Sequence, residues 1–329
     1  MSYNKLLDES TWDDVNQDSK DLLEDYMLEL EATGKSEKTR YQYFADIRGF
    51  LSWILRNGKN KSILELKKRD FRNFFLKMSK QGTSNARINR LQSSIRNLLA
   101  YAEGDEDMYE DYEVNQMRNI KGVPKEAVRD IVFLTDEEVT GLIDYLVKKE
   151  EYQKALYVSL SYDSAARRNE IHQVKKEGFL DNSQTNEVIG KRSKKFKLLY
   201  FKRTKDIAKL WLDQRGDDDI ESMWITGKGS NKRELSYESL YAWAVSFRPI
   251  IKELFDDDVD LNSHSFRHAS LTNYNNGTHA VLKELGKESL PLSVLKLVAH
   301  HSSSETTESY LKNRDDEILS DAFGIDLDN

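Results

Sequence analysis

The chain has 329 residues, of which 38% are hydrophobic and 33% charged, with 3 prolines and no cysteine. This composition predicts a folded, mainly helical protein of about two domains, and it excludes disulfides, thiolate metal sites and a cysteine nucleophile. No apolar run approaches the roughly 20 residues needed to cross a bilayer, and the first residues lack a signal-peptide core. We therefore expect a cytoplasmic protein without a membrane partner.

The net charge of −7 is unevenly distributed along the chain. Residues Met1–Glu31 hold ten acidic residues against two basic ones, and Glu103–Glu113 hold seven acidic residues and none that is basic. By contrast, Lys67–Arg96 and Lys191–Lys209 each carry nine lysines or arginines and one acidic residue. Charge runs are usually solvated surfaces, but two basic windows in an acidic chain also fit a groove that selects a phosphate backbone.

The N-terminal part, after an acidic extension over residues 1–17, predicts about four helices. One includes Leu22–Leu30. A second has apolar residues at helical spacing from Tyr43 to Ile54, with Ser36 as its cap and Gly58 as its stop. Two more end near Gly82 and Gly104. We interpret residues 18–120 as one helical domain and residues 121–132, which contain Gly122 and Pro124, as a linker.

The remaining residues, 133–329, are interpreted as a second domain. Thr135 and Glu138 are spaced as a capping box at the start of a helix. Val188 and Ile189 precede a glycine, and mixed apolar and basic residues follow as far as Phe201, which predicts a short β-hairpin. The other segments have helical patterns. The predicted fold class is therefore mainly α with a small β-sheet, an α+β arrangement.

Five of the 6 histidines lie close together in the sequence, at positions 264, 268, 279, 300 and 301. His264 and His268 are four residues apart on a predicted helix and could share a metal ion, but Arg267 between them disfavours a divalent cation. His264 and Arg267 instead suit a phosphate, because both can donate hydrogen bonds to it. "SAARRNEI" supplies further arginines, Arg167 and Arg168, which could equally form an exposed helix start or a structural ion pair.

The order of "SAARRNEI", "IGKRSKK", "HSFRH" and "VAHHSSSETTESY" resembles that of the tyrosine recombinases, the integrase family of site-specific DNA recombinases. Their pattern is Arg, hairpin Lys, His-x-x-Arg, His, and a Tyr nine residues later, which is the spacing from His301 to Tyr310. The N-terminal helices resemble the core-binding domain of this family. The resemblance covers about residues 18–320, and it implies a core-binding domain followed by a catalytic domain with a C-terminal tail helix.

Transferred residue by residue, the resemblance implies two phosphate-clamping arginines, Arg167 and Arg267, with Glu170 as the buttressing carboxylate. Lys191 takes the place of the general-acid lysine, although Lys194 and Lys195 are close enough to leave that choice open. The two histidines are His264 and His301. Tyr310 is the nucleophile, which would form a 3′-phosphotyrosine without any metal or other cofactor.

This sequence departs from the family pattern at a few positions. Ser164-Ala165 replaces the usual Thr-Gly before the first arginine, and His300 stands where the family usually has glycine. The span from Arg267 to His301 is also longer than usual, which predicts an inserted loop or a longer helix there.

The implied partner is double-stranded DNA, in the setting of integration, excision or transposition of a mobile element. The expected contacts are Lys38, Arg40, Arg87 and Arg90 in the first domain and Lys194, Lys195 and Lys197 on the hairpin. The tail after Tyr310 suits docking on a neighbouring subunit in a homotetramer, or packing on its own domain. Accessory DNA-bending proteins are possible partners. Two alternatives remain: a catalytically silent DNA-binding relative and a metal-dependent phosphodiesterase.

Overall fold

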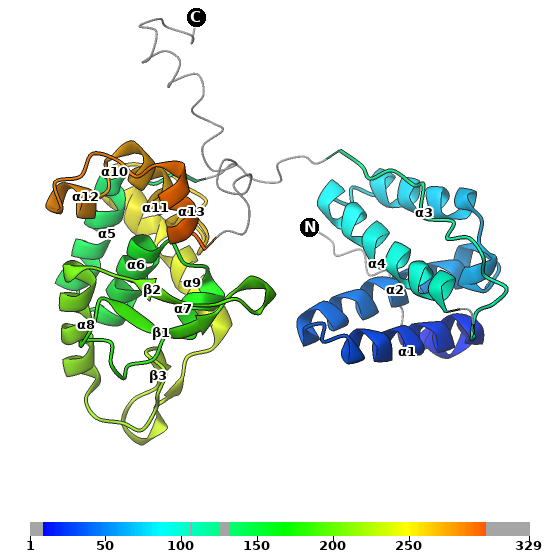
Figure 1. Cartoon of the computed structure of the whole chain (residues 1–329), viewed down its shortest axis with the longest axis horizontal. Helices are drawn as coiled ribbons and strands as arrows, with labels where there is room; N and C mark the ends of the chain where they lie inside the picture. The colour runs from blue at the N-terminus through cyan, green and yellow to red at the C-terminus, as the bar shows by residue number, and fades with distance from the viewer. Residues whose placement is uncertain (1–8, 106, 125–131, 301–329) are drawn as a thin grey trace, which may run out of the picture. The chain divides into compact units, whose positions relative to one another are not determined.

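The structure is a computed structural model that describes residues 9–105, 107–124 and 132–300. The chain divides into two compact units, residues 1–130 and 131–329 (Figure 1), and the division falls within the predicted linker. Each unit has its own apolar core. In the described residues, no helix is both long enough and apolar enough to span a membrane.

In its described residues, the first unit is built from four α-helices whose ends follow local sequence signals. The side chains of Asn16, Ser36 and Ser84 each cap a helix start by accepting a backbone N–H, and Gly58 follows the second helix, as predicted. The apolar faces of the helices meet in one core that is rich in contacting aromatic rings: Phe50 stacks on Phe71 and meets Phe74 at a tilt. Its elements are η1 (Glu9–Asp14), α1 (Gln17–Ala32), α2 (Glu37–Asn57), η2 (Ile63–Glu65), α3 (Lys68–Lys80) and α4 (Asn85–Gly104).

The second unit contains nine helices in its described part and two small antiparallel sheets, which confirms the mainly α fold class. The predicted Thr135–Glu138 capping box is present at the start of its first helix. Its helices are α5 (Asp136–Lys148), α6 (Tyr152–Ser164), α7 (Arg168–His172), α8 (Lys202–Arg215), α9 (Tyr237–Ser246), α10 (Arg248–Phe255), α11 (Ser265–Asn276), α12 (Ala280–Glu284) and α13 (Leu292–Val298).

The larger sheet is the predicted β-hairpin, formed by β1 (Gln184–Ile189) and β2 (Lys195–Leu199) around the 3-10 turn η3 (Lys191–Ser193). Val188 pairs with Phe196, and Ile189 with Lys195. The side chains of Val188 and Leu198 are buried in the main core, while the lysines of the hairpin are exposed. The hairpin therefore presents a basic surface on an apolar base.

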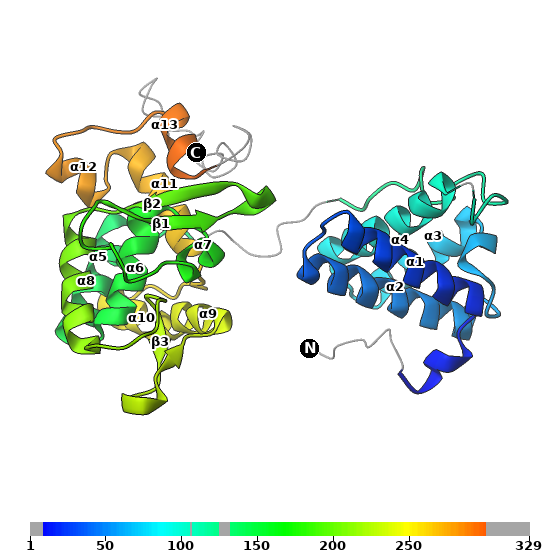
Figure 2. The ribbon, with the colours of Figure 1, turned by 60° about the horizontal axis from the view of Figure 1, so that its bottom comes forward.

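Helix α6 is the central element of the second unit, and it packs against α5, α8 and α11 (Figure 2). All ten residues from Ala155 to Ser164 are buried, as expected for a helix that is covered on every side. Its polar side chains are satisfied internally: Asp163 accepts hydrogen bonds from the Phe201 backbone and the Thr204 hydroxyl at 3.0 and 2.6 Å. The C-terminal end of α6 is thus held in a fixed place, and the next residues begin the candidate site.

The predicted insertion between Arg267 and His301 consists of the short helix α12 and the loop that joins it to α13, not of a longer helix. Helix α11 ends at Gly277, whose φ is +74° and where a side chain would collide with the Glu288 carbonyl. The ring of His279 is stacked between Tyr162 and Tyr274, with ring centroids 4.0 and 3.8 Å away. These contacts fasten the insertion onto α6 and α11.

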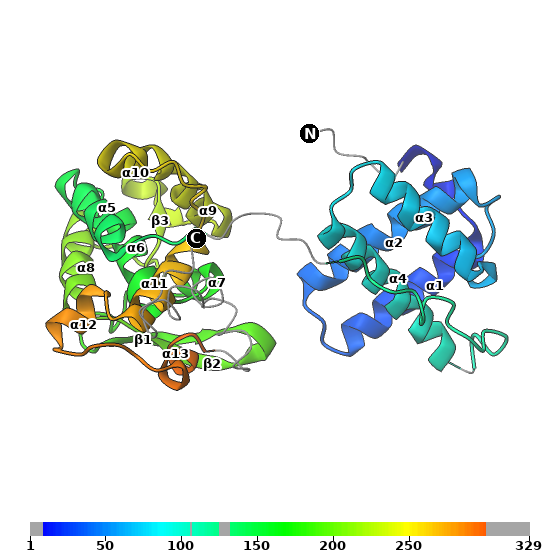
Figure 3. The same ribbon diagram turned by 90° about the horizontal axis from the view of Figure 1, so that it is seen from above.

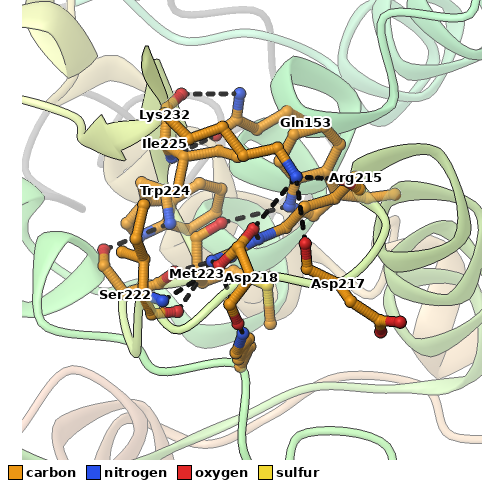
Figure 4. A network of polar contacts seen from close by, with 12 residues as sticks. Gln153, Arg215, Asp217, Asp218, Ser222, Met223, Trp224, Ile225 and Lys232 are labelled. Carbon is orange, nitrogen blue, oxygen red and sulfur yellow. Dashed lines mark hydrogen bonds and ion pairs between the residues drawn. The ribbon is translucent and has the colours of Figure 1, made fainter. Parts of the chain in front are cut away.

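A second sheet, formed by β3 (Ile225–Thr226) and β4 (Arg233–Glu234) around η4 (Gly229–Asn231), is anchored by a buried ion cluster (Figure 4). The Arg215 side chain is completely covered and binds both carboxylate oxygens of Asp218, at 2.8 and 2.6 Å. It also donates to the carbonyls of Ser222 and Ile220, both at 2.7 Å. The ammonium groups of two lysines pair with the same carboxylate, those of Lys176 and Lys232.

Candidate active site

The first part of the site lies where α6 ends and α7 begins. The backbone N–H of Arg167 donates to the Glu170 carboxylate at 2.7 Å, and its guanidinium donates to the same carboxylate at 2.9 Å. Glu170 is 1% exposed, whereas the Arg167 side chain is 30% exposed. The buried carboxylate therefore fixes an arginine whose guanidinium is still partly accessible.

Arg267 reaches the same place from the first turn of α11, and its side chain is completely buried. Its guanidinium donates to the carbonyl of Ala165 and, at 2.7 Å, to the carbonyl of Ala299. It therefore ties together the α6–α7 connection and the end of α13, two segments that are far apart in the sequence. A guanidinium has five N–H donors in one plane, and these two carbonyls fix the orientation of that plane.

The two departures from the family glycines lie next to those carbonyl groups. Ala165 has φ +50° and His300 has φ +51°, so both residues adopt the left-handed conformation that glycine adopts most readily. Ala165 forms the C-terminal cap of α6, and His300 directly follows the residue that caps α13. The chain thus has the left-handed backbone conformation that favours glycine at both positions, although each position carries a side chain.

His264 lies at the N-cap of α11, one turn before Arg267, and its ring meets that of His268 edge to face at 4.8 Å. His264 is exposed overall, but desolvation by the surrounding protein and then the charges of Arg267 and Arg167 lower its pKa to about 4. Desolvation, followed by His264 and Arg267, lowers the pKa of His268 to about 3. Both rings are neutral at pH 7 and lie within the field of the arginines.

The hairpin turn reaches Glu170 through Gly190, the residue that precedes Lys191. Gly190 has no room for a side chain, because a Cβ there would lie 2.6 Å from the Phe196 ring and 3.1 Å from Glu170 Oε1. Its N–H donates to the Lys194 carbonyl at 2.8 Å, which closes the turn that contains Lys191. Lys191 and Lys194 are both exposed. The structure therefore brings the turn to the arginine site, but it does not choose between the two lysines.

His300 is a member of this group for which the sequence gave no role. Its ring stacks on Phe196, with centroids 3.7 Å apart and planes inclined by 19°. Burial, then the charges of Lys194, Arg267 and Arg167, lower the pKa of His300 to about 4. Apolar and basic residues alternate along the first four residues of β2, so Phe196 lies on the same face as the buried Leu198. The sequence contains no signal that links Phe196 to His300.

The other predicted site residues have different outcomes. His301 and Tyr310 lie outside the described residues, as does the tail. His279 is 1% exposed, and burial lowers its pKa to about 4, in keeping with a packing role between two tyrosines. Within residues 9–105, 107–124 and 132–300, no three histidine, aspartate or glutamate side chains are grouped so that they could hold a metal ion.

The predicted DNA contacts of the first unit are partly engaged in the fold. Arg90 binds Asp46 with two hydrogen bonds of 3.0 Å, and Arg40 pairs with Glu31 at 2.6 Å. Lys38 is exposed, and Arg87 is half-buried near the start of α4. On the hairpin, Lys194 and Lys197 are exposed, and so is Lys195, which lies 3.4 Å from Glu187.

Comparison with known proteins finds similarity along most of the chain. Residues 22–106 match the family model of the phage integrase N-terminal SAM-like domain. The SPbeta prophage-derived recombinase-like protein YomM of Bacillus subtilis (strain 168) is 26% identical over 323 residues, which cover 93% of this chain and 91% of that protein. A tyrosine recombinase of Thermosipho africanus (strain TCF52B) is 23% identical over 314 residues, or 90% and 95% of the two chains.

Solved structures share the fold. A lambda integrase (75–356) dimer bound to a COC' core site superimposes with a TM-score of 0.65 at 15% identity, covering 88% of this chain and 94% of that one. XerH site-specific recombinase bound to a palindromic difH substrate gives a TM-score of 0.66 at 18% identity, covering 92% and 83%. Along most of its length the chain is therefore similar in sequence to the tyrosine recombinases, and it shares the two-unit fold of the integrase and recombinase structures.

Proposed function

We propose that this chain is an active site-specific recombinase that cleaves and rejoins duplex DNA through a 3′-phosphotyrosine. The observation that carries the proposal is the group of cations around α7. The positive charges of Arg167 and Arg267 both lower the pKa of His264 and of His300, and the charge of Lys194 also lowers the pKa of His300. One buried carboxylate, that of Glu170, pairs with Arg167 in this group. A phosphodiester would supply the negative charge that such a group attracts.

In the proposed reaction, the phenolic oxygen of Tyr310 attacks the scissile phosphorus and the bond from phosphorus to the 5′ oxygen breaks. The phenol loses its proton to His264 or His301, and Lys191 or Lys194 gives a proton to the leaving 5′ oxygen. His264 is neutral at pH 7 but a weak base, and in this proposal the negative charge of a bound phosphate offsets the arginine charges that lower its pKa. Because the phosphodiester energy is kept in the phosphotyrosine, a 5′-hydroxyl of a partner strand can reverse the step and rejoin the DNA.

The two arginines take different parts in this scheme. In this proposal Arg167, whose side chain is partly exposed, contacts the phosphate directly, while Arg267 is completely buried and must be uncovered before it can do so. Both would stabilise charge that develops on the phosphate oxygens in the transition state. Loss of a preorganised donor of this kind typically lowers the rate by about 100-fold or more.

Residues 18–120 are proposed as the core-binding domain and residues 133–329 as the catalytic domain. In the first, α3 carries exposed basic side chains suited to the phosphate backbone, among them Arg69, Arg72 and Lys80. The lambda integrase structures contain dimers on a core site and a tetramer on a Holliday junction, which supports a homotetramer on DNA for this chain. Docking of the tail on a neighbouring subunit and the use of accessory DNA-bending proteins are parts of the same proposal.

The proposal is tested by trapping the covalent intermediate. Duplexes selected by this chain from a random-sequence library, and then nicked at successive positions, are incubated with the protein in EDTA and separated on a denaturing gel. We expect a covalent protein–DNA adduct that disappears in Tyr310→Phe and persists in Tyr241→Phe, whose tyrosine is an exposed residue of α9. Binding without an adduct would indicate a silent DNA-binding relative, and cleavage only with added metal would indicate a phosphodiesterase.

A further inference from the structure

The end of α13 lies beside the β1–β2 hairpin (Figure 3), and an aromatic contact joins the two. The imidazole of His300 lies against the ring of Phe196 at a centroid distance of 3.7 Å, nearly parallel to it. His300 is anchored on its own side, because its N–H donates to the Leu297 carbonyl at 3.1 Å and the preceding carbonyl, that of Ala299, accepts from Arg267. The imidazole therefore extends from a fixed backbone towards the hairpin.

Phe196 also contacts Gly190, at the start of the lysine turn. Its ring lies so close to Gly190 that no Cβ fits there, and the same glycine lies beside the Glu170 carboxylate that holds Arg167. Gly190 directly precedes Lys191, and its N–H closes the turn on the Lys194 carbonyl at 2.8 Å. A continuous path of contacts thus leads from His300 through Phe196 to the turn that carries both candidate general acids.

The charge state of His300 suits a packing contact at this place. Burial and the positive charges of Lys194, Arg267 and Arg167 keep its pKa near 4, so the ring is uncharged at pH 7. An uncharged imidazole stacks on phenylalanine without adding to the repulsion between the cations. A glycine at this position would fit the backbone φ of +51° but would leave the exposed face of Phe196 without its partner.

We propose that His300 is a positioning residue: its ring, stacked on Phe196, holds the hairpin lysine turn against the arginine pair. This inference rests on the proposed function for its catalytic consequence, but the contact itself does not. His300 also directly precedes His301, which begins the segment that leads to Tyr310. The stack would therefore set the lysine side of the reaction relative to the start of the nucleophile segment.

Two variants separate the ring from the backbone. His300→Gly relaxes the left-handed backbone and removes the ring, whereas His300→Phe keeps a flat ring and removes the nitrogens. We expect trypsin to cleave the folded His300→Gly protein after Lys191 or Lys194 roughly three- to tenfold faster than the wild type, because the hairpin loses an aromatic contact. His300→Phe should be cleaved at the wild-type rate. Cleavage after Lys209, an exposed residue of α8 in the same unit, serves as the internal control for unfolding.

A chemical substitution then tests whether His300 acts through the lysine. We expect His300→Gly to form adduct roughly tenfold more slowly than the wild type on ordinary DNA, because small misplacements of a catalytic group have effects of at least this size. A 5′-bridging sulfur leaves without a proton, so a duplex that contains it should restore the rate of His300→Gly but not that of Arg167→Ala. His300→Phe should need no rescue.

The outcomes are distinct. Unchanged trypsin cleavage in His300→Gly would overturn the positioning contact, whatever the activity. A loosened hairpin without rescue by sulfur would overturn the claim that His300 works through the lysine. Absence of any adduct with the wild-type protein would refute the proposed function, while the trypsin comparison would still decide whether the stack holds the hairpin.

Discussion

The second unit contains two groups of cationic side chains that are built in opposite ways. Around Asp218, the buried guanidinium of Arg215 and two lysines converge on one carboxylate, and the carbonyls of Ser222 and Ile220 take up further arginine donors. Around α7, the positive charges of Lys194, Arg267 and Arg167 lower the pKa of His300, and Glu170 pairs with Arg167. The first group is neutralised by its own carboxylate, whereas for the second we propose a DNA phosphate as the anion.

The difference shows why arginine in a buried place does not by itself indicate a site. Arg215 and Arg267 are both completely covered, and both donate to backbone carbonyls. Arg215 has a bidentate carboxylate, which accounts for its role in holding β3 and β4 to α8. Arg267 is bound to the two carbonyls beside Arg167 and His300, so its charge adds to the positive field of a partly open site.

The largest expected effect concerns the neutralised group. Replacing Arg215 by alanine should lower the free energy of unfolding by about 3–5 kcal/mol, because Asp218 loses its bidentate partner in a covered place. Lys209→Ala on the same helix removes only an exposed pair with Asp206 and should change stability by less than about 1 kcal/mol. Denaturant unfolding of the two variants checks the contrast. Equal stability losses would mean that Arg215 does not anchor this region.

The next effect concerns the group around α7 and appears in rate. Arg167→Ala should slow adduct formation by about 100-fold or more, since a preorganised donor to the phosphate is lost. Its neighbour Arg168 lies instead over the ring of Tyr237, 3.8 Å from the centroid, and Arg168→Ala should slow the reaction by less than about tenfold. Single-turnover kinetics on the nicked duplex distinguish the two. A similar loss in both variants would remove the distinction between clamp and neighbour.

The pKa values of His264 and His300 report which group of cations affects these histidines electrostatically. Removing the Arg167 charge should raise the pKa of His264 and His300 by a small part of the lowering, because burial is its largest cause, whereas Arg215→Ala should leave both pKa values unchanged. The imidazole signals of the two histidines can be followed by NMR as the pH is lowered. No movement of either pKa in Arg167→Ala would show that this arginine does not act on the histidines.

The same lowered pKa values set a direction for acid stability. A histidine whose folded pKa lies below its unfolded value contributes stability that is complete above about pH 6.5 and is lost as the pH falls towards 4. His279, which is buried between two tyrosines, should contribute most clearly. Asp163 acts in the opposite sense, because burial raises its pKa to about 6 and its contribution declines as the pH rises through that value. His279→Phe should therefore lose less stability than the wild type between pH 6.5 and 4.5, by about 1–2 kcal/mol.

The smallest effect concerns the backbone of the site. Ala165→Gly should raise the free energy of unfolding by up to about 1 kcal/mol, because relief of the left-handed alanine outweighs the added freedom of the unfolded chain. The adduct rate should change little, since the carbonyl that orients Arg267 is retained. Thermal unfolding measures the first expectation, and a clear loss of stability would show that the Ala165 methyl group matters more than its φ.

Much of this architecture could be predicted from the sequence because its signals are local. Ser36 and Gly58 flank α2, the Thr135–Glu138 capping box opens α5, and the hairpin follows from its apolar residues on either side of a basic turn. The convergence of Arg167 and Arg267 was predicted only through resemblance to a family, since nothing local relates them. The stack of His300 on Phe196 was not predicted, because it depends on where a whole hairpin packs.

The contacts of Arg267 with the carbonyls of Ala165 and Ala299 could not be predicted from the sequence either. They require Ala165 and His300 to adopt left-handed backbone conformations, which a pattern of side chains does not reveal at positions without glycine. The family glycines at both positions were the available signal. In physical terms, the sequence specifies elements through nearby residues, but a site made by tertiary contacts depends on the packing of all of them.

The central claim is that the cations around α7 hold a DNA phosphate for attack by Tyr310. Its most direct test is to digest the trapped protein–DNA adduct and identify by mass spectrometry the side chain that carries the nucleotide. The account predicts a single modified peptide with a nucleotide 3′-phosphate on Tyr310, in an amount that falls about 100-fold or more in Arg167→Ala. Attachment to any other residue, or equal labelling without Arg167, would contradict it.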